Sequence, residues 1–393
     1  MLVTGALLSV AAAHAQREVR PNYKSSVPGL DYAHIQTTNW NNGEPWSIHI
    51  ARLDRSQKNL RVAETLAQQQ VFGTASVSAI AKSFPKDQGG LLVAINAGFC
   101  IRTKHTYLGA PRGMVITDGE LVSSPALSPA NYSFWINDNG AMHFGTFQPA
   151  FSATLPDGTT VPLGLNNECK SNGVVLFTHM LGTNTRATNN LELILENPKR
   201  KQLSWRVGES YILRVRAVNL SGNTALSNNV SVLSFGNQTA SKASHLRAGD
   251  KIKLELKTSP GLNHVVTACH AIFPIVQNGK PLEKFDANAV IQHRNPRTAI
   301  GFNARYFYMV VVDGRQKDIS MGMKAKELAE FMALLGCTEA ANLDGGGSST
   351  FWMDGERRNS VPGGIERARG DALIIVQKVG TKPTEPPIRQ AGE

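Results

Sequence analysis

The chain has 393 residues, of which 41% are hydrophobic. This length and composition allow a sizeable core in one large domain or two ordinary ones, and they do not fit a chain that is disordered throughout. The formal net charge is +11, which indicates affinity for anionic partners. The basic residues are scattered and do not cluster with aromatic residues, so no nucleic acid is expected. We expect a phosphorylated carbohydrate or an anionic cell-envelope polysaccharide, with a basic surface that only aids solubility as the alternative.

The first fifteen residues resemble a secretory signal peptide. Residues 1–15 have an apolar core and end in Ala13-His14-Ala15, although a basic start is absent. A membrane anchor needs about 20 apolar residues, and this stretch is shorter. No later segment is long and apolar enough to span a bilayer. We therefore expect an exported protein, secreted or periplasmic, whose mature chain begins near Gln16.

Most of the chain has the pattern of β-strands. Period-two alternation at 46–53 and 251–256 predicts half-buried strands. Asp118-Gly119 and Asn139-Gly140 follow apolar runs, as hairpin turns do. Further short apolar runs predict strands at 91–95, 174–177, 211–218, 230–235, 307–312 and 371–377.

Helices are fewer. Apolar residues at helical spacing predict one helix over 74–84 and another over 324–335, the second ended by Gly336. Many strands with a few helices indicate an α+β fold with a strand-rich sheet core in a single large domain. The polar, strand-rich segment 149–261 is either a large insertion or a second lobe of that fold.

The four cysteines, Cys100, Cys169, Cys269 and Cys337, are far apart and form no C-x-x-C pair. A structural zinc site is therefore not expected. In an oxidising compartment they allow up to two disulfides, and buried free thiols are the alternative. The tail 381–393 is rich in proline and is expected to be extended and disordered.

The most distinctive stretch is Asn342-Leu343-Asp344-Gly345-Gly346-Gly347-Ser348-Ser349-Thr350. Three glycines after a carboxylate favour a backbone that takes positive φ or approaches a ligand closely, and their amides can bind an anion. The stretch lacks the Lys-Ser/Thr pair of a P-loop and the last glycine of a G-x-S-x-G elbow. Nucleotide binding and serine-hydrolase chemistry are thus disfavoured, and a plain glycine turn is the structural alternative.

Three other stretches place polar residues at strand ends. Asn96-Ala97-Gly98-Phe99 follows the strand predicted at 91–95, Asn295-Pro296-Arg297-Thr298-Ala299-Ile300-Gly301 precedes a strand, and Asp313-Gly314-Arg315 ends the strand predicted at 307–312. Polar groups at strand ends tend to converge, although each of these stretches also fits ordinary turn chemistry.

Taken together, in this order and with these separations, the four stretches and the helix 323–336 between them resemble the phosphodiester glycosidase family. The resemblance covers 91–376 and implies a single domain over 20–380 that includes the polar middle segment. The family usually has Asn-Gly-Gly where this chain has Asn96-Ala97-Gly98. It often has a glycine-rich run where this chain has Ala268-Cys269-His270-Ala271-Ile272. These departures bear on sugar specificity more than on the fold.

The resemblance implies an exported glycoside hydrolase that cuts between an anomeric carbon and a phosphate oxygen, in envelope or exopolysaccharide-type substrates. Such a site must bind phosphate and stabilise an oxocarbenium-like transition state. Arginine offers a planar fork for phosphate oxygens, so Arg297 is the first candidate and Arg294 the second. Asp344 and Asp313 are the candidate catalytic carboxylates, with retention and inversion both open.

Several further residues are candidate substrate contacts, with a core histidine as the alternative for His270: Asn96, Gly98, Thr298, Gly345, Gly346, Gly347, Ser348, Ser349 and His270. No cofactor or metal is expected, because no dense acidic ligand run is present, although two carboxylates with amide oxygens leave Ca²⁺ or Mg²⁺ open. The competing function is a non-catalytic protein that binds anionic polysaccharide or sugar phosphate. A phosphoesterase is disfavoured by the lack of His/Asp clusters for two metals.

Overall fold

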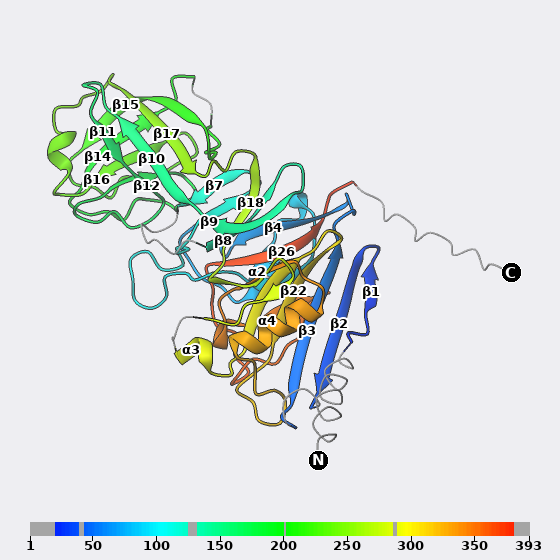
Figure 1. The fold of residues 1–393 in the computed structure, drawn as a ribbon. Helices are drawn as coiled ribbons and strands as arrows, with labels where there is room; N and C mark the ends of the chain where they lie inside the picture. Colours follow the sequence, from blue (N-terminus) through cyan, green and yellow to red (C-terminus); the bar gives the residue numbers. More distant parts are fainter. Residues whose placement is uncertain (1–19, 39–42, 125–131, 200–201, 286–288, 381–393) are drawn as a thin grey trace, which may run out of the picture.

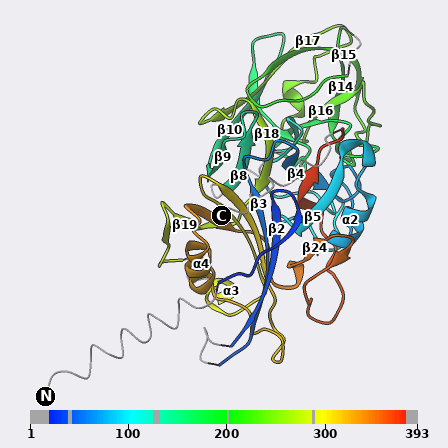
Figure 2. The same cartoon turned by 90° about the vertical axis from the view of Figure 1, so that its right-hand side faces the viewer.

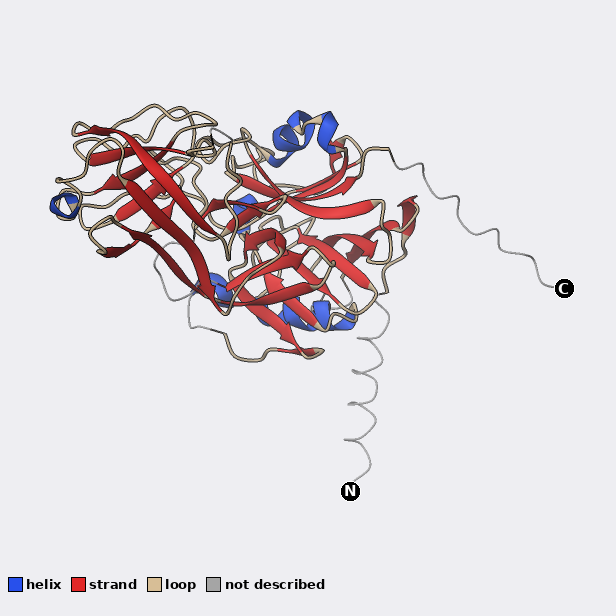
Figure 3. Cartoon of the chain, turned by 90° about the horizontal axis from the view of Figure 1, so that it is seen from above, coloured by secondary structure: helices blue, strands red, loops and turns tan. Residues whose placement is uncertain are grey.

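The computed structural model describes residues 20–38, 43–124, 132–199, 202–285 and 289–380. The signal peptide expected at 1–15 and the tail expected at 381–393 lie outside these residues. Strands are the main regular element of the described chain, and its helices are few and short (Figure 3). The α+β class expected from the sequence is confirmed.

The first of two stacked sheets carries helix α4 (Ala325–Leu334) on one face. Its strands, in spatial order, are β1 (Lys24–Val27), β2 (Leu30–Thr37), β3 (Trp46–Asp54), β22 (Tyr306–Val312), β21 (Arg297–Phe302), β23 (Glu339–Asn342), β19 (Phe273–Gln277) and β20 (Lys280–Pro281). The β2, β3, β22, β21 and β23 strands pair antiparallel in succession. Apolar side chains alternate between the two faces of this sheet, as the period-two pattern predicts.

A second sheet packs against the other face of the first. It contains β25 (Glu356–Arg357), β24 (Phe351–Met353), β5 (Gly90–Asn96), β26 (Asp371–Gln377) and β4 (Leu60–Leu66). Ile95, Phe351 and Leu373 meet Met309 and Val311 of the first sheet in one buried cluster. Helix α2 (Val77–Ser83) covers the outer face of the second sheet. Helices α4 and α2 thus lie on opposite sides of two stacked sheets (Figure 2).

Two further sheets extend the molecule at one end (Figure 1). One contains β7 (Glu120–Ser123), β6 (Val115–Thr117), β18 (Val265–His270), β8 (Tyr132–Asn137) and β9 (Met142–Thr146). The other, here called the middle lobe, contains β11 (Thr160–Pro162), β10 (Gln148–Thr154), β17 (Lys251–Ser259), β15 (Ser210–Asn219), β14 (Leu191–Glu196), β16 (Ser231–Phe235), β13 (Val174–Phe177) and β12 (Gly164–Leu165).

The middle lobe is the polar segment that the sequence left as an insertion or a second lobe. Its apolar core also contains Met114, Ile116, Leu121 and Ala268, which come from outside the segment. Burying these shared side chains against the lobe stabilises both parts. The lobe is therefore a second lobe of a single domain, joined to the rest through a common core.

The predicted elements are present, with small differences at the helix ends. Helix α2 begins later than the expected 74–84 because the Ser76 hydroxyl caps it, accepting from the amide of Ala79 at 3.1 Å. Helix α4 is close to the expected 324–335, with Glu327 accepting from the amide of Lys324 at 2.8 Å. Gly336 follows it at a φ of +83°, the left-handed conformation that ends helices.

Both predicted hairpins are present, with Asp118-Gly119 joining β6 to β7 and Asn139-Gly140 joining β8 to β9. The remaining short elements are helix α3 (Ala289–Gln292) and the 3₁₀ turns Lys86–Gln88, Ala240–Lys242 and Gly346–Ser348. The four cysteines are free thiols, so the alternative without disulfides holds.

Candidate active site

The glycine loop (residues 343–350) carries the chain from β23 of the first sheet to β24 of the second. Gly345, Gly346 and Gly347 are half-buried, and Gly346 has a φ of +62°. A Cβ atom at Gly345 would lie 3.0 Å from the carbonyl oxygen of Pro296, closer than ordinary packing allows. The loop therefore needs glycine for both reasons expected from the sequence, positive φ and close approach.

Asn96, the last residue of β5, ties the two ends of the glycine loop together. Its side-chain amide donates to the carbonyl oxygen of Asp344 at 2.6 Å, and its side-chain oxygen accepts from the amide of Thr350 at 3.1 Å. The hydroxyl of Thr298 donates to the same side-chain oxygen at 2.8 Å. Asn96 and Thr298 are completely buried. Their contacts favour a role in shaping the loop over the direct substrate contact expected from the sequence.

Asp344 forms an ion pair with Arg369, a residue that the sequence did not single out. The Arg369 Nη2 atom lies 2.8 Å from the Asp344 carboxylate and also donates to the carbonyl oxygen of Gly98 at 2.8 Å. Its Nη1 atom donates to the hydroxyl of Ser348 at 3.1 Å. The arginine side chain is 0% exposed, whereas that of Asp344 is 10% exposed. The pair thus joins a fully buried cation to a carboxylate that is largely buried but keeps some accessible surface.

Three more arginines surround the glycine loop. Cβ atoms added at Gly346 and Gly347 would lie 3.1 Å from Arg315 Nη2 and 2.5 Å from Arg367 Nη2. Partial burial, followed by the charge of Arg102, lowers the pKa of Arg367, and Asp344 opposes this shift. Arg102, Arg315, Arg367 and Arg369 are called the arginine cluster below. Four like charges beside the single carboxylate of Asp344 create a positive field that attracts an anion.

The arginine cluster keeps donors for a ligand. Arg315 uses Nε and Nη2 to bind the side-chain oxygen of Asn295 at 3.0 and 2.8 Å. Its Nη1 atom is left to donate to a ligand. Arg367 makes one hydrogen bond within the described chain, a contact of 3.4 Å from Nη1 to Ser348. In the loop itself, Gly346 donates its amide to Pro296. Within the described residues the amides of Gly345 and Gly347 have no such partner.

Gly98 and His270 lie beside the ion pair. A Cβ atom at Gly98 would lie 2.6 Å from the carbonyl oxygen of His270, and one at Gly113 would lie 2.5 Å from the His270 Cβ. His270 is buried, and its Nδ1 atom has no hydrogen-bond partner among the described residues. Burial, and then the charge of Arg112, lower the pKa of His270 to about 4. His270 is therefore a neutral ring at neutral pH, packed under the loop that contains Gly98.

Arg297 and Arg294, the two expected phosphate contacts, are occupied by the protein. The Arg297 guanidinium donates to the carbonyl oxygens of Met323 at 2.8 Å, His293 at 2.9 Å and Ile291 at 3.1 Å. Arg294 forms ion pairs of 2.8 Å with Glu44 and with Glu327. These contacts favour a structural role for both arginines over the phosphate contact expected from the sequence.

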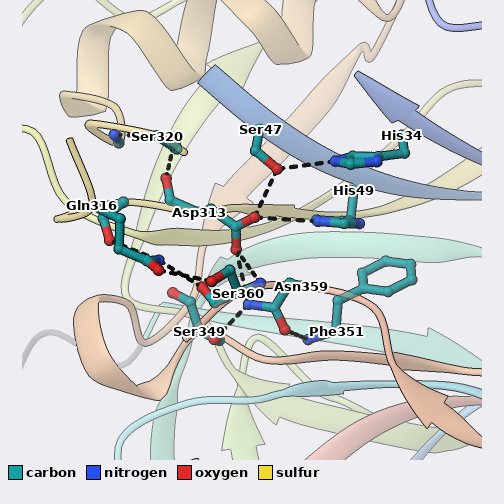
Figure 4. Close-up of polar contacts among 12 residues, drawn as sticks. His34, Ser47, His49, Asp313, Gln316, Ser320, Ser349, Phe351, Asn359 and Ser360 are labelled. Atoms are coloured by element: carbon teal, nitrogen blue, oxygen red, sulfur yellow. Dashed lines mark hydrogen bonds and ion pairs between the residues drawn. The ribbon is translucent and has the colours of Figure 1, made fainter. Parts of the chain in front are cut away.

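Asp313 lies in a buried network of its own (Figure 4). Its Oδ2 atom accepts from Ser47 at 2.7 Å and lies 3.3 Å from Nε2 of His49, and its Oδ1 atom accepts from Asn359 at 3.1 Å and from the amide of Ser360 at 2.9 Å. Because Ser47 donates its hydroxyl hydrogen to the carboxylate, it is not activated as a nucleophile by His34, which lies 3.0 Å away.

The Asp313 network holds the far end of the glycine loop. The Asn359 side chain that donates to Asp313 also donates to the carbonyl oxygen of Ser349 at 3.1 Å and accepts from the amide of Phe351 at 2.8 Å. In the described chain the Asp313 and Asp344 carboxylates share no hydrogen-bond partner. The expected carboxylate pair is thus not seen as a contact, and Asp313 is placed to position the loop.

The two serines of the loop differ in their surroundings. Ser348 is completely buried and accepts from Arg369, and Ser349 is 1% exposed with an Oγ atom that has no partner among the described residues. The described residues contain no group of three His, Cys, Asp or Glu side chains placed to hold a metal ion. None of their helices is long and apolar enough to cross a membrane.

Sequence reasoning missed Arg367 and Arg369. Both lie in Glu366-Arg367-Ala368-Arg369-Gly370, directly before the buried strand β26. Alternating basic residues at the start of a buried strand are a weak signal that could have marked them, since charges are rarely placed there without a partner. His49 was missed for another reason, because it lies inside the alternating strand 46–53 and resembles an ordinary strand residue.

A family model described as phosphodiester glycosidase matches residues 210–376. That range contains the glycine loop, Arg315, Arg367 and Arg369, and excludes Asn96 and Arg102. The prophage-derived protein YomE of Bacillus subtilis is 35% identical over 103 residues, which make up 26% of this chain and 16% of that protein. The match therefore spans only a small part of the length of that relative.

Solved structures share the fold at low sequence identity. A protein from Synechocystis superposes with a TM-score of 0.71 at 20% identity, over 92% of this chain and 64% of its own. A candidate exported protein of Burkholderia pseudomallei superposes with a TM-score of 0.66 at 19% identity, over 85% of this chain and 74% of its own. The catalytic domain of zebrafish N-acetylglucosamine-1-phosphodiester α-N-acetylglucosaminidase superposes with a TM-score of 0.46 at 17% identity. That superposition covers 90% of this chain and 86% of the zebrafish domain. The family match over 210–376 confirms the resemblance of this chain to the phosphodiester glycosidase family.

Proposed function

We propose that this protein is an exported glycosidase that hydrolyses the bond between the anomeric carbon of a sugar and the oxygen of a phosphodiester, in envelope or exopolysaccharide-type substrates. The observation that carries the proposal is the arginine cluster around the glycine loop, directly beside the Asp344 carboxylate. The family match supports a glycosidase that acts on phosphodiester substrates. The exported location rests on the signal-like residues 1–15.

The arginine cluster suits the phosphate part of such a substrate. Arg315 and Arg367 present free guanidinium N–H groups next to the free amides of Gly345 and Gly347. Charge-assisted hydrogen bonds from arginine to phosphate oxygens are short and strong. As the glycosidic bond breaks, negative charge builds up on the departing phosphomonoester, and these donors stabilise it. In this proposal Arg315 and Arg367 take the role first expected of Arg297 and Arg294.

Asp344 suits the sugar part. The phosphomonoester leaves without strong help from a general acid, so the main demand on a carboxylate is to stabilise the oxocarbenium-like carbon or to orient water toward it. The Asp344 carboxylate is held in one direction by Arg369 and keeps 10% of its side-chain surface accessible beside the arginine cluster. Its position lets one side chain face the anomeric carbon while the cluster holds the phosphate.

The experiment is a product assay of the purified mature protein on a panel of glycosyl-1-phosphodiesters, with detection of free sugar. We expect release of reducing sugar and of an intact phosphomonoester, with label from ¹⁸O-water entering the sugar. Label in the phosphate would indicate a phosphoesterase. Binding without sugar release from any member of the panel would favour the non-catalytic alternative. The matched control is Lys242→Ala, which removes an exposed basic residue of the middle lobe. N-terminal sequencing of protein recovered from the envelope tests export.

A further inference from the structure

Phe99 is the one phenylalanine, tyrosine or tryptophan of the described chain whose side chain is exposed, with 40% of its surface accessible. It directly follows Gly98 in the loop after β5. A single exposed apolar residue is ordinary on a protein surface. The position of Phe99 is not ordinary, because the backbone carbonyls of residues 97–99 make three hydrogen bonds to the candidate active site and to the loop that supports it.

The backbone on both sides of Phe99 is fixed. The carbonyl oxygen of Ala97 accepts from the amide of Asp344 at 3.2 Å, and that of Gly98 accepts from Arg369 at 2.8 Å. The carbonyl oxygen of Phe99 itself accepts from the amide of Arg112 at 2.8 Å. An exposed phenyl ring thus stands on a rigid segment, two residues from the residue that binds the Asp344 amide.

The ring is also supported from behind. The centroids of the Phe99 and His270 rings lie 6.1 Å apart with an interplanar angle of 57°. His270 is buried, and glycines at 98 and 113 let its Cβ and carbonyl approach the backbone. A tilted aromatic pair of this kind stabilises the orientation of the outer ring. Phe99 therefore presents a supported ring to solvent, two residues from the Ala97 carbonyl that binds the Asp344 amide.

We propose that Phe99 is a specificity-determining residue that stacks against the sugar ring of the substrate, while the arginine cluster binds the adjacent phosphate. The proposal rests on the proposed function, because it assigns the sugar half of the same site. The face of a phenyl ring carries negative charge density, which attracts the polarised C–H bonds on the apolar face of a pyranose. Arg102, three residues after Phe99 and coupled to Arg367, places positive charge near the same loop.

The test compares the wild type with Phe99→Ala and Phe99→Trp by isothermal titration calorimetry, using three probes: inorganic phosphate, glucose 1-phosphate and N-acetylglucosamine 1-phosphate. We expect Phe99→Ala to bind inorganic phosphate as the wild type does and to bind a sugar 1-phosphate roughly tenfold more weakly. Phe99→Trp, which keeps an aromatic face, should retain the affinity. Ile212→Ala, which removes another exposed apolar side chain on β15, is the matched control and should change neither.

Each other outcome overturns the inference. Equal loss for phosphate and for the sugar phosphates would show that the substitution disturbs the loop. Unchanged binding of both sugar phosphates by Phe99→Ala, or a wild type that binds them no more tightly than phosphate, would remove the stacking role. The proposed function is judged separately by sugar release from phosphodiesters. A wild type that shows the Phe99-dependent affinity but releases no sugar would retain the sugar contact and reject the glycosidase activity.

Discussion

The guanidinium of Arg369 lies 2.8 Å from the carboxylate of Asp344, and the arginine side chain has no exposed surface. This pair gives Asp344 two separable properties, a structural one and a chemical one. As a counter-ion it neutralises a buried cation, and as the member of the pair that keeps some accessible surface it is available to the proposed substrate. A substitution at Asp344 therefore has to be measured for stability and for activity.

We expect Asp344→Asn to lower sugar release by about a hundredfold or more, as when a positioned acid or base is removed. It should also lower the free energy of unfolding by about 3 kcal/mol, because Arg369 loses its buried counter-ion. The double variant Asp344→Asn/Arg369→Gln removes both charges and should regain part of the stability without regaining activity. Activity assays and chemical denaturation of the same preparations check both. A stable, active Asp344→Asn protein would leave Asp344 as a turn residue.

Arg297 and Arg367 allow a paired test of which arginine binds phosphate. Arg297 donates to three backbone carbonyls in the interior, which a lysine ammonium cannot reproduce. Arg297→Lys should therefore lower the free energy of unfolding by about 2 kcal/mol. The Tm should fall with it. Arg367 is exposed and loosely held, so Arg367→Lys should leave the Tm unchanged and raise KM for phosphodiesters about tenfold. The reverse pattern would return the phosphate contact to Arg297.

The fold was more predictable from the sequence than the site. The strand at 46–53 was predictable because a period of two follows from strand geometry, and the strand at 371–377 because a short apolar run fits a buried strand; the structure has a strand at both places. The glycine loop and Asn96 were also found, since turn chemistry and strand ends are local features. Helix α2 was placed three residues early because the capping role of Ser76 competes with the apolar pattern.

The partners of charged residues were not predictable, because they depend on chain segments far apart in the sequence. Arg369 precedes β26 of the second sheet and meets Asp344, which follows β23 of the first, and Arg297 donates to the carbonyl of Met323, 26 residues away. Asp313 and Asp344 have similar sequence settings, each at the end of a buried strand. Both are buried, but Asp313 is enclosed by four polar groups, whereas Asp344 pairs with Arg369 and keeps 10% of its side chain accessible. The partners that separate these two cases are set by the tertiary structure.

Gly98 tests how tightly the loop beside the ion pair is packed. A methyl group there would lie 2.6 Å from the backbone oxygen of His270, so Gly98→Ala must displace either β18 or the loop that binds Arg369. We expect a loss of about 1–3 kcal/mol in stability together with weaker binding of sugar 1-phosphate. Gly90→Ala, at the start of the strand that precedes Gly98, is the matched control, since its added methyl would meet only Gln377 at 3.9 Å. Equal stability of the two variants would contradict the close packing.

Two carboxyl groups, those of Glu64 and Asp371, are buried on the neighbouring strands β4 and β26 near Arg369. Burial, and then the charge of Asp371, raise the pKa of Glu64 well above its usual value. Burial also raises the pKa of Asp371 to about 7, although Arg369 opposes the shift. In the unfolded chain both groups release their protons near pH 4. Between pH 4 and 7 the folded protein therefore binds more protons than the unfolded chain.

Because the folded state holds the extra proton, the free energy of unfolding should fall as the pH rises from about 4 to about 7, by up to about 1.4 kcal/mol per pH unit for one proton. Glu64→Gln keeps a hydrogen-bonding group but has no proton to release, so its stability should fall less steeply over this window. The exposed Glu283→Gln is the control and should follow the wild type. Urea denaturation at pH 4.5, 5.5, 6.5 and 7.5 measures the difference. Parallel curves for wild type and Glu64→Gln would show that the pair does not retain a proton in the folded protein.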